Sequence, residues 1–508
     1  MNVSSKSRVS SKNLFKRTFY LLEMITGAVL IIGTAYYIDT LAHSGVGVII
    51  SWAIALLILL MSLFSYSSAV FVVIFVTAII PFYARQIYQI YQMGGVWSEL
   101  YHTPFTVNFL GITLANWLYV LLGMNGIIYL YCRKERLSRD IYIIIITVLL
   151  GIPILIIGLL YQDKIYWRQV LSSFQYSILV PLGALVGCRL VKEVGKQRTQ
   201  KILYKLFWFA FIISGLRAVL FLVSDYIRGS MSLQLGVEEV IFNPFVFACL
   251  AERQIIDSRF KLVVFLVLSW LVILPTGRNT WILLIVNSVV LFVLFVCRMK
   301  PSTILVRKQV IHRFTSFVVI ALLVFIIMGI LSPNLCRFIL FKLSFFRELF
   351  TGNLTSSPLT RIYEFKNISA ENYDLGLVGV LFGKGAGGYF TFAHYLPPFE
   401  LDISAYSSEE LSIGIFFNPH DFVNVWLLKG GLIGLGWYIV TILCIFLLSL
   451  REARLMINAG VKYNIALWLL FFCPVALLHA VWKPNIAFLF GFMSGVVNTG
   501  AKIYEREE

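Results

Sequence analysis

The sequence predicts an all-α, polytopic membrane protein with about 14 transmembrane helices and one large structured outer loop. Three observations lead to this fold class. First, 59% of the 508 residues are hydrophobic and only 13% are charged, whereas soluble domains are about 45–50% apolar and about 25% charged. Second, apolar runs of membrane-spanning length recur along the whole chain. Third, Lys and Arg are dense in alternate connections between those runs.

The apolar runs define the predicted spans. A bilayer core of about 30 Å is crossed by about 20 apolar residues in a helix. Fourteen segments fit this template, in chain order 19–38, 47–65, 69–86, 105–131, 141–161, 176–192, 204–225, 238–251, 259–275, 280–297, 314–331, 421–449, 463–480 and 484–500. Residues 1–331 thus hold the first eleven spans and residues 421–508 the last three. The first span lacks a small-residue cleavage site, so we expect it to be retained rather than removed as a signal peptide.

The positions of Lys and Arg predict the orientation, because basic residues collect on the cytoplasmic side. The connections predicted to be cytoplasmic, together with both chain ends, hold 28 of the 42 basic residues. Both termini are therefore expected in the cytoplasm. The net charge of +17 would suggest a nucleic-acid partner in a soluble chain. Here it is an orientation signal facing anionic membrane lipids, and we expect no nucleic acid as partner.

Residues 332–420 interrupt the rhythm of short connections. This outer segment is far longer than the usual loop of about 4–6 residues, and such loops are usually functional or disordered. It contains amphipathic helical stretches that begin near Arg337 and at Arg361, a glycine-rich turn over 383–388, and many aromatic residues. We therefore predict a structured cap on the outer face.

Three arginines on the predicted outer half are candidates for anion binding, since ionisable groups in or near a membrane are functional candidates by default. Arg217 lies about 12 Å from the outer end of its span, at 1.5 Å per residue. Arg278 stands in a short outer hairpin, and Arg361 opens an amphipathic stretch of the cap. A guanidinium group matches phosphate oxygens in a bidentate manner. The alternatives are a structural ion pair for Arg217, an interfacial anchor for Arg278 and a solvated face for Arg361.

His420 is the candidate general base. It opens a long span directly after the cap, and at 100° per residue it shares a helix face with Asn424, Leu427, Gly431 and Gly434. The small residues allow close helix packing, which would hold the imidazole in a protein-lined outer cavity. A neutral imidazole near pH 7 suits proton abstraction. Three arginines and one histidine therefore suggest phosphate binding combined with proton abstraction.

Metal and cofactor sites are not predicted. The seven cysteines are scattered without metal-ligand spacing, and they are expected to be small buried hydrophobic residues. No carboxylate cluster has a spacing suited to Mg²⁺. Any chemistry on the outer face is therefore expected to need neither a metal nor a cofactor.

Three segments resemble, in the same order, motifs of the O-antigen ligase and polymerase family (WaaL- and Wzy-type proteins). His420-Asp421, nine residues and then Gly431-x-x-Gly434 are similar to the family's His followed by a Gly-x-x-Gly pair. The stretch from Thr276 to Trp281 is similar to its Ser/Thr-x-x-Arg stretch, and Arg361 with the glycines of 383–387 is similar to the Arg and Gly-x-Gly of its large periplasmic loop. The resemblance covers roughly 270–440. Asp421 and Lys429 depart from the usual pattern.

The resemblance implies a GT-C-like glycosyltransferase of the inner (plasma) membrane that joins undecaprenyl-diphosphate-linked repeat units on the periplasmic side. His420 would deprotonate the acceptor hydroxyl, and Arg217, Arg278 and Arg361 would bind the diphosphate. A chain-length regulator and a flippase are further partners that it implies. The span number favours a polymerase, while a ligase that transfers glycan to lipid A–core stays an alternative. A lipid-linked oligosaccharide flippase or other transporter is a third, although the two halves of the chain show no matching motifs.

Overall fold

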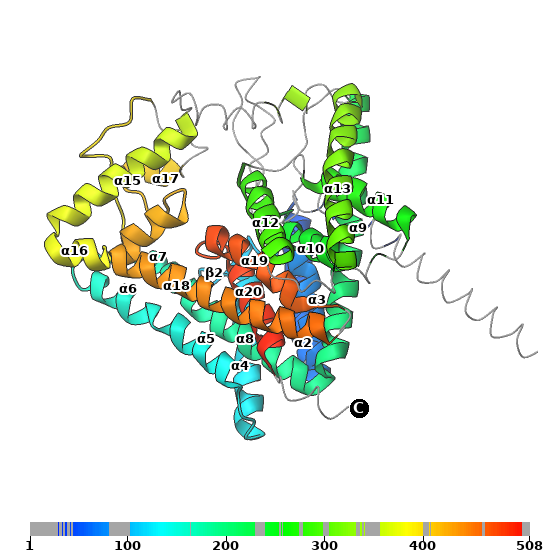
Figure 1. Cartoon of the computed structure of the whole chain (residues 1–508). Coiled ribbons are helices and arrows are strands. Elements are labelled where there is room, and N and C mark those ends of the chain that lie inside the picture. Colours follow the sequence, from blue (N-terminus) through cyan, green and yellow to red (C-terminus); the bar gives the residue numbers. More distant parts are fainter. Residues whose placement is uncertain are drawn as a thin grey trace, which may run out of the picture.

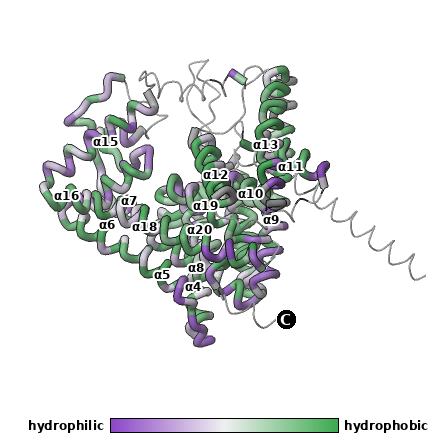
Figure 2. Tube along the Cα trace, viewed as in Figure 1, coloured by the Kyte–Doolittle hydropathy of each residue, from purple (hydrophilic) through white to green (hydrophobic). Residues whose placement is uncertain are grey.

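A computed structural model describes residues 44–80, 102–162, 164–228, 239–252, 258–273, 278–297, 304–331, 356–399, 408–459 and 463–499, with a few further single residues. These residues are mostly helical, and the helices form a bundle with a smaller helical cap at one end (Figure 1). Most helices of the bundle are hydrophobic along their length, whereas hydrophilic stretches mark helix ends and parts of the cap (Figure 2).

The first half of the chain contributes eight helices and one short hairpin to the described residues. These are α2 (Gly45–Phe64), α3 (Tyr66–Ile79), β1 (Asn108–Phe109), β2 (Ile112–Thr113), α4 (Leu114–Cys132), α5 (Arg139–Leu149), α6 (Gly151–Leu159), α7 (Trp167–Ser173), α8 (Gln175–Val194) and α9 (Lys196–Arg228). The second half contributes α10 (Glu239–Ala251), α11 (Arg259–Ile273), α12 (Arg278–Cys297), α13 (Ile304–Leu331), α15 (Ser356–Asp374), α16 (Gly376–Phe382), α17 (Ser408–Ile413), α18 (Phe422–Asn458), α19 (Ile465–His479) and α20 (Pro484–Asn498).

Every predicted span after the first overlaps one of these helices or the pair α5–α6, and residues 81–86 of the span 69–86 lie outside the described residues. The first, 19–38, lies almost wholly outside the described residues. Within the described part, five helices are long and apolar enough to cross a membrane, and α7 with α8 form a sixth candidate bent by 43°. Five shorter apolar helices of 10–17 residues accompany them. The chain is therefore an all-α membrane protein.

The predicted span 105–131 begins differently from the expectation. Its first residues form the antiparallel hairpin of β1 and β2, and the helix begins only at Leu114. Leu110 and Gly111, between the strands, both have positive φ, as the two-residue turns favoured in hairpins require. The Thr113 side chain then caps α4 by accepting from the Asn116 N–H. The helix therefore begins at Leu114 and not at 105, because the hairpin occupies residues that hydropathy alone assigned to the span.

Close packing of glycines joins α8 and α20 at the centre of the bundle (Figure 1). Gly183 and Gly187 of α8 face Gly491 and Gly495 of α20. A Cβ atom at any of these four positions would lie 2.0–2.3 Å from a backbone oxygen of the other helix. Both pairs have the small-xxx-small spacing that lets membrane helices approach closely. Glycine is therefore required at these four positions, because the two backbones leave no room for a side chain.

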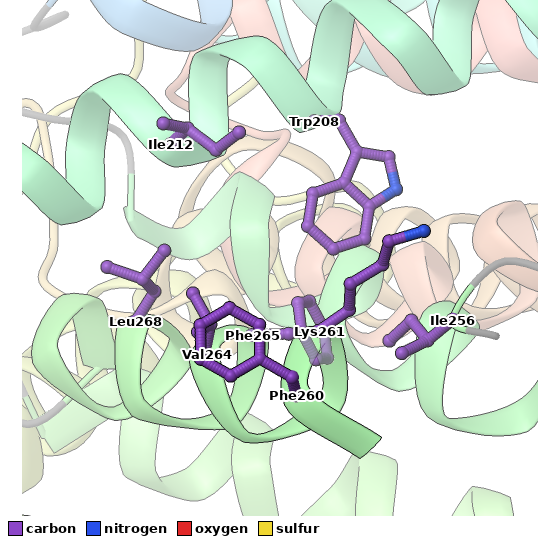
Figure 3. A pocket seen from close by; sticks show the side chains of 8 residues that line it. All are labelled: Trp208, Ile212, Ile256, Phe260, Lys261, Val264, Phe265 and Leu268. Carbon is purple, nitrogen blue, oxygen red and sulfur yellow. The ribbon is translucent and has the colours of Figure 1, made fainter. Parts of the chain in front are cut away.

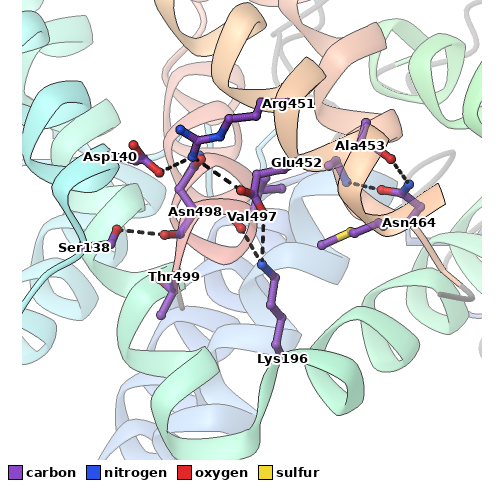
Figure 4. A network of polar contacts seen from close by, with 12 residues as sticks. Ser138, Asp140, Lys196, Arg451, Glu452, Ala453, Asn464, Val497, Asn498 and Thr499 are labelled. Carbon is purple, nitrogen blue, oxygen red and sulfur yellow. Dashed lines mark hydrogen bonds and ion pairs between the residues drawn. The ribbon is translucent and has the colours of Figure 1, made fainter. Parts of the chain in front are cut away.

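Segments predicted to share the cytoplasmic side contact one another (Figure 4). Lys196 at the start of α9 donates to the Val497 carbonyl at 2.7 Å and pairs with Glu452 of α18 at 3.6 Å. Arg451 pairs with Asp140, and the Ser138 hydroxyl donates to the Asn498 carbonyl at 2.7 Å. We call this set the α18 C-terminal cluster. It ties the ends of α5, α9, α18 and α20 together.

Segments predicted to share the outer side also meet. The Gln162 side chain, between α6 and α7, donates to the carbonyls of Lys384 and Ala386 in the cap, the latter at 2.8 Å. The Gly387 N–H donates to the Ser173 hydroxyl at 3.1 Å. The described part of the predicted outer segment 332–420 is thus structured, with α15, α16 and α17 as its helices. The stretch that begins near Arg337 lies mostly outside the described residues.

The cap is seated on a break in α18. Gly431 has φ 58° and ψ −157° within this helix, a conformation that strongly favours glycine. A Cβ there would lie 2.4 Å from the backbone carbon of Leu381, and a Cβ at Gly383 would lie 2.6 Å from the Leu428 oxygen. The Leu428 carbonyl, freed by the break, accepts from the Lys384 N–H at 2.6 Å. Gly431 therefore joins bundle and cap through a helix break, not through the continuous helix face expected from the sequence.

Candidate functional site

His420 lies at the junction between the cap and α18, where it pairs with a buried carboxylate. Its Nδ1 atom is 2.5 Å from Oε1 of Glu364 on α15, and its backbone N–H donates to Oε2 of the same group at 3.0 Å. The Glu364 side chain has no exposed surface, whereas 27% of the His420 side chain is exposed. Glu364 thus contacts His420 at the Nδ1 atom of its ring and at its backbone N–H.

Two further side chains donate to the same carboxylate. The Tyr406 hydroxyl donates to Oε1 of Glu364 at 2.5 Å, and the Asn424 amide donates to Oε2 at 3.2 Å. The Tyr406 ring also meets the His420 ring edge-on, with centroids 5.0 Å apart. Burial, followed by the charge of Glu364, raises the pKa of Tyr406. Tyr406 is therefore a neutral hydrogen-bond donor here.

Asp421 is the N-cap of α18, and this assigns a role to a residue that departs from the family pattern. Its Oδ1 accepts from the Asn424 backbone N–H at 2.8 Å, which satisfies a donor that the first helical turn leaves open. Its Oδ2 accepts from the Asn424 side chain at 3.0 Å. His420 itself precedes the helix.

Arg361 is the predicted arginine that the structure places in this cluster. Its backbone carbonyl accepts from the Asn424 amide at 2.9 Å, and it lies one helical turn before Glu364 on α15. Its Nε atom is buried without a hydrogen-bond partner among the described residues. A buried guanidinium donor without a partner is costly, and a bound anion would satisfy it.

Arg217 and Arg278 stand on other helices. Arg217 belongs to α9, and Arg278 is the first residue of α12. The side chains of both arginines lie outside the described part of the structure. In Figure 1 these two helices stand in a different part of the bundle from α15 and α16. The described residues therefore bring Arg361, but not the other two arginines, to His420.

Glu364 and Tyr406 are the residues that sequence reasoning missed. Glu364 stands in the stretch Arg361-Ile362-Tyr363-Glu364, where it reads as part of a solvated amphipathic face. Its pairing with His420 joins positions 56 residues apart. The usable signal is the helical spacing, because residues i and i+3 share a face and Arg361 was already a candidate. The face expected to be solvated is in fact buried at Glu364.

The predicted face of α18 is buried as expected. Contacts with the cap contribute to this burial, in addition to the close helix packing expected from the small residues. Asn424 is 2% exposed and Leu427 is 9% exposed. The Leu427 carbonyl accepts from the Asn372 amide of α15 at 2.8 Å. The cap helices α15 and α16 cover Leu427 and Gly431, and Ile154 of α6 lies next to Gly434.

An apolar pocket elsewhere in the bundle is separate from this cluster. It has a volume of about 270 Å³ and lies between α9 and α11. Trp208 of α9 and Phe265 of α11, whose ring centroids are 5.2 Å apart, are among the residues that line it, together with Lys261 (Figure 3). It offers no acid–base pair, so His420 and its neighbours are the better candidate for chemistry.

Comparisons with known proteins give no assignment. No family model matches the chain, and no curated protein matches it. Among the described residues, no group of three or more His, Cys, Asp and Glu side chains could hold a metal ion. The function of the protein is therefore inferred from the geometry of the site and from the motif resemblance.

Proposed function

We propose that the protein is a membrane glycosyltransferase that joins lipid-diphosphate-linked oligosaccharide repeat units, with His420 as general base. The observation that carries this proposal is the setting of His420. A partly exposed imidazole stands directly before α18 and contacts Glu364 through Nδ1, and Arg361, whose Nε has no partner among the described residues, lies one helical turn before Glu364 on α15. A base and a guanidinium donor in one cluster suit the attack of a hydroxyl on a sugar phosphate.

The proposed reaction follows from these two groups. The acceptor hydroxyl oxygen attacks the anomeric carbon of the donor sugar, and His420 takes the hydroxyl proton. The bond from the anomeric carbon to the diphosphate oxygen breaks, and the diphosphate leaves with the electron pair. Arg361 stabilises the charge that develops on this leaving group. Arg217 and Arg278, the other two arginines predicted from the sequence to bind the diphosphate, stay predictions, because the described part of the structure does not place their side chains.

The remaining parts of the proposal concern placement. The cap would face the periplasm of the inner (plasma) membrane, where it would cover the growing glycan, and both termini would lie in the cytoplasm. The substrate is an undecaprenyl-diphosphate-linked oligosaccharide that reaches the site from the membrane. The contacts among segments with dense Lys and Arg support this orientation, because they gather at the end of α18 that lies away from the cap.

The test is His420→Ala in the native host, with the surface polysaccharide displayed on a gel. A polymerase predicts that the long ladder collapses to core that bears a single repeat unit. A ligase predicts loss of all attached glycan with accumulation of long lipid-linked chains. A normal ladder from His420→Ala protein, present in the membrane at the wild-type amount, would remove His420 from the mechanism.

A further inference from the structure

We infer that Glu364 is a positioning residue that fixes the tautomer and orientation of His420 for proton abstraction. This inference depends on the proposed function for its catalytic meaning, although the pairing itself can be tested without it. Nothing in the motif resemblance assigns Glu364 a role.

The hydrogen bonds around Glu364 favour an ionised carboxylate. Besides His420 Nδ1, it accepts from the His420 backbone N–H, the Tyr406 hydroxyl and the Asn424 amide. Each of these three groups is a donor, and donors stabilise the charged form of a carboxylate. A carboxylate has no proton to give, so Nδ1 of the ring must be the donor in the 2.5 Å contact.

The tautomer follows from this contact. A neutral imidazole carries one proton, and Glu364 holds that proton on Nδ1. The basic lone pair is then on Nε2, at the far side of the ring from α15. The negative charge of Glu364 also stabilises the imidazolium that forms when His420 accepts a proton, as the carboxylate of a catalytic triad does. His420 is thereby prepared as a base at one defined atom.

Both negatively and positively charged side chains surround the His420 ring. Among the residues that the structure describes, the titratable and charged groups that face it or its partners include Glu364 and Arg361 of α15, Tyr406, Glu410 of α17, and the adjacent Asp421. Of these, Glu364 is the carboxylate in direct contact with the imidazole. Neutralising Glu364 therefore removes a negative charge that directly contacts the ring.

The variant that tests the inference is Glu364→Gln, which keeps the side-chain size. Purified full-length protein is assayed with lipid-linked oligosaccharide isolated from host cells that carry His420→Ala. We expect kcat to fall by about 10²–10⁴-fold while KM changes little, because substrate binding is retained and the base is misoriented. The acid limb of the activity–pH profile should move to lower pH. Glu364→Asp, which keeps the charge, should retain more activity than Glu364→Gln.

Glu371→Gln is the matched control. Glu371 lies on the same helix, is also largely buried, and binds Lys384 and Thr391. The same substitution there removes a cap carboxylate without contact to the ring. If Glu371→Gln moves the activity–pH profile as Glu364→Gln does, the effect belongs to the cap fold and the inference fails.

A second measurement is independent of catalysis. With ¹⁵N-labelled histidine, the His420 ring is identified by its absence in His420→Gln, and its protonated nitrogen is read from the ¹⁵N shifts. We expect Nδ1–H in the wild type and in Glu371→Gln, and a shifted tautomer balance in Glu364→Gln. An unchanged spectrum and wild-type kcat in Glu364→Gln would overturn the inference even if His420→Ala is inactive. A wild type that joins no glycan would instead defeat the proposed function, while the spectra still decide the pairing.

Discussion

Two buried polar clusters lie toward opposite ends of α18, and they differ in what they leave accessible. At the C-terminal end, the side chains of Lys196 and Glu452 are 2% and 4% exposed and pair with each other. At the N-terminal end, Glu364 is equally buried, but its partner His420 keeps 27% of its side chain exposed. A closed ion pair fixes helices relative to one another. A cluster that holds one partly exposed ring in a fixed orientation is arranged for chemistry.

The largest expected effect is a loss of stability on mutation of the α18 C-terminal cluster. Lys196→Ala removes the buried cation that pairs with Glu452 and leaves this carboxylate to the half-exposed Arg451 at 3.4 Å; breaking a buried pair costs up to about 3–5 kcal/mol. We therefore expect a strong loss of stability in unfolding of detergent-solubilised protein, with unchanged activity of the fraction that stays folded. The control is Lys196→Met combined with Glu452→Leu, which removes both charges and should recover most of the loss. A stable Lys196→Ala protein would mean that this pair is not a structural tie.

A pH dependence should come from the same end of the molecule. Burial raises the pKa of Glu252, next to the start of α19, from its ordinary 4.5 to about 7. The folded state then binds the proton more tightly than the unfolded state. Its stabilising contribution is therefore complete below about pH 4.5 and is lost as the pH rises through 7, by up to about 3 kcal/mol.

The measurement for Glu252 is the unfolding midpoint between pH 4.5 and 8. Glu252→Gln cannot titrate, so its profile should be flatter over this range than that of the wild type. Parallel profiles for the two proteins would show that another group controls the dependence. At the other end of α18, Glu364→Gln should change the activity profile instead, which makes the comparison of the two clusters direct.

The sequence predicts most of the fold but only part of the site, and particular residues show why. Helices that bury long apolar runs coincide with their predicted segments, because span length and hydropathy are local properties. His420 and Arg361 were also candidates from local patterns. Glu364 was not, because its burial depends on the docking of α15 against a helix more than 50 residues away. The break at Gly431 likewise depends on the approach of the 383–387 loop, which no local pattern contains.

Arg361→Lys tests whether Arg361, next to Glu364 and His420, binds the diphosphate. Lysine keeps the charge but loses the planar fork that binds two phosphate oxygens. We expect activity to fall by about 10- to 100-fold, equivalent to about 1.4–2.7 kcal/mol, with unchanged thermal stability. Because Lys366 is on the same helix and exposed, Lys366→Arg is a suitable control and should have wild-type activity. Equal activity of Arg361→Lys and wild type would show that the fork does not bind the leaving group.

The smallest expected effect comes from removing the Tyr406 hydroxyl, which shares Oε1 of Glu364 with His420 Nδ1. Tyr406→Phe removes the hydroxyl at 2.5 Å but keeps the ring that meets His420 edge-on. A single hydrogen bond contributes about 0.5–1.5 kcal/mol, so activity should fall by roughly 2- to 12-fold. The activity–pH profile should keep its position, because no charge is removed. If Tyr406→Phe were as damaging as Glu364→Gln, the hydroxyl rather than the carboxylate would control the ring. The relative activities of Tyr406→Phe and Glu364→Gln therefore decide whether the hydroxyl or the carboxylate prepares His420 for proton abstraction.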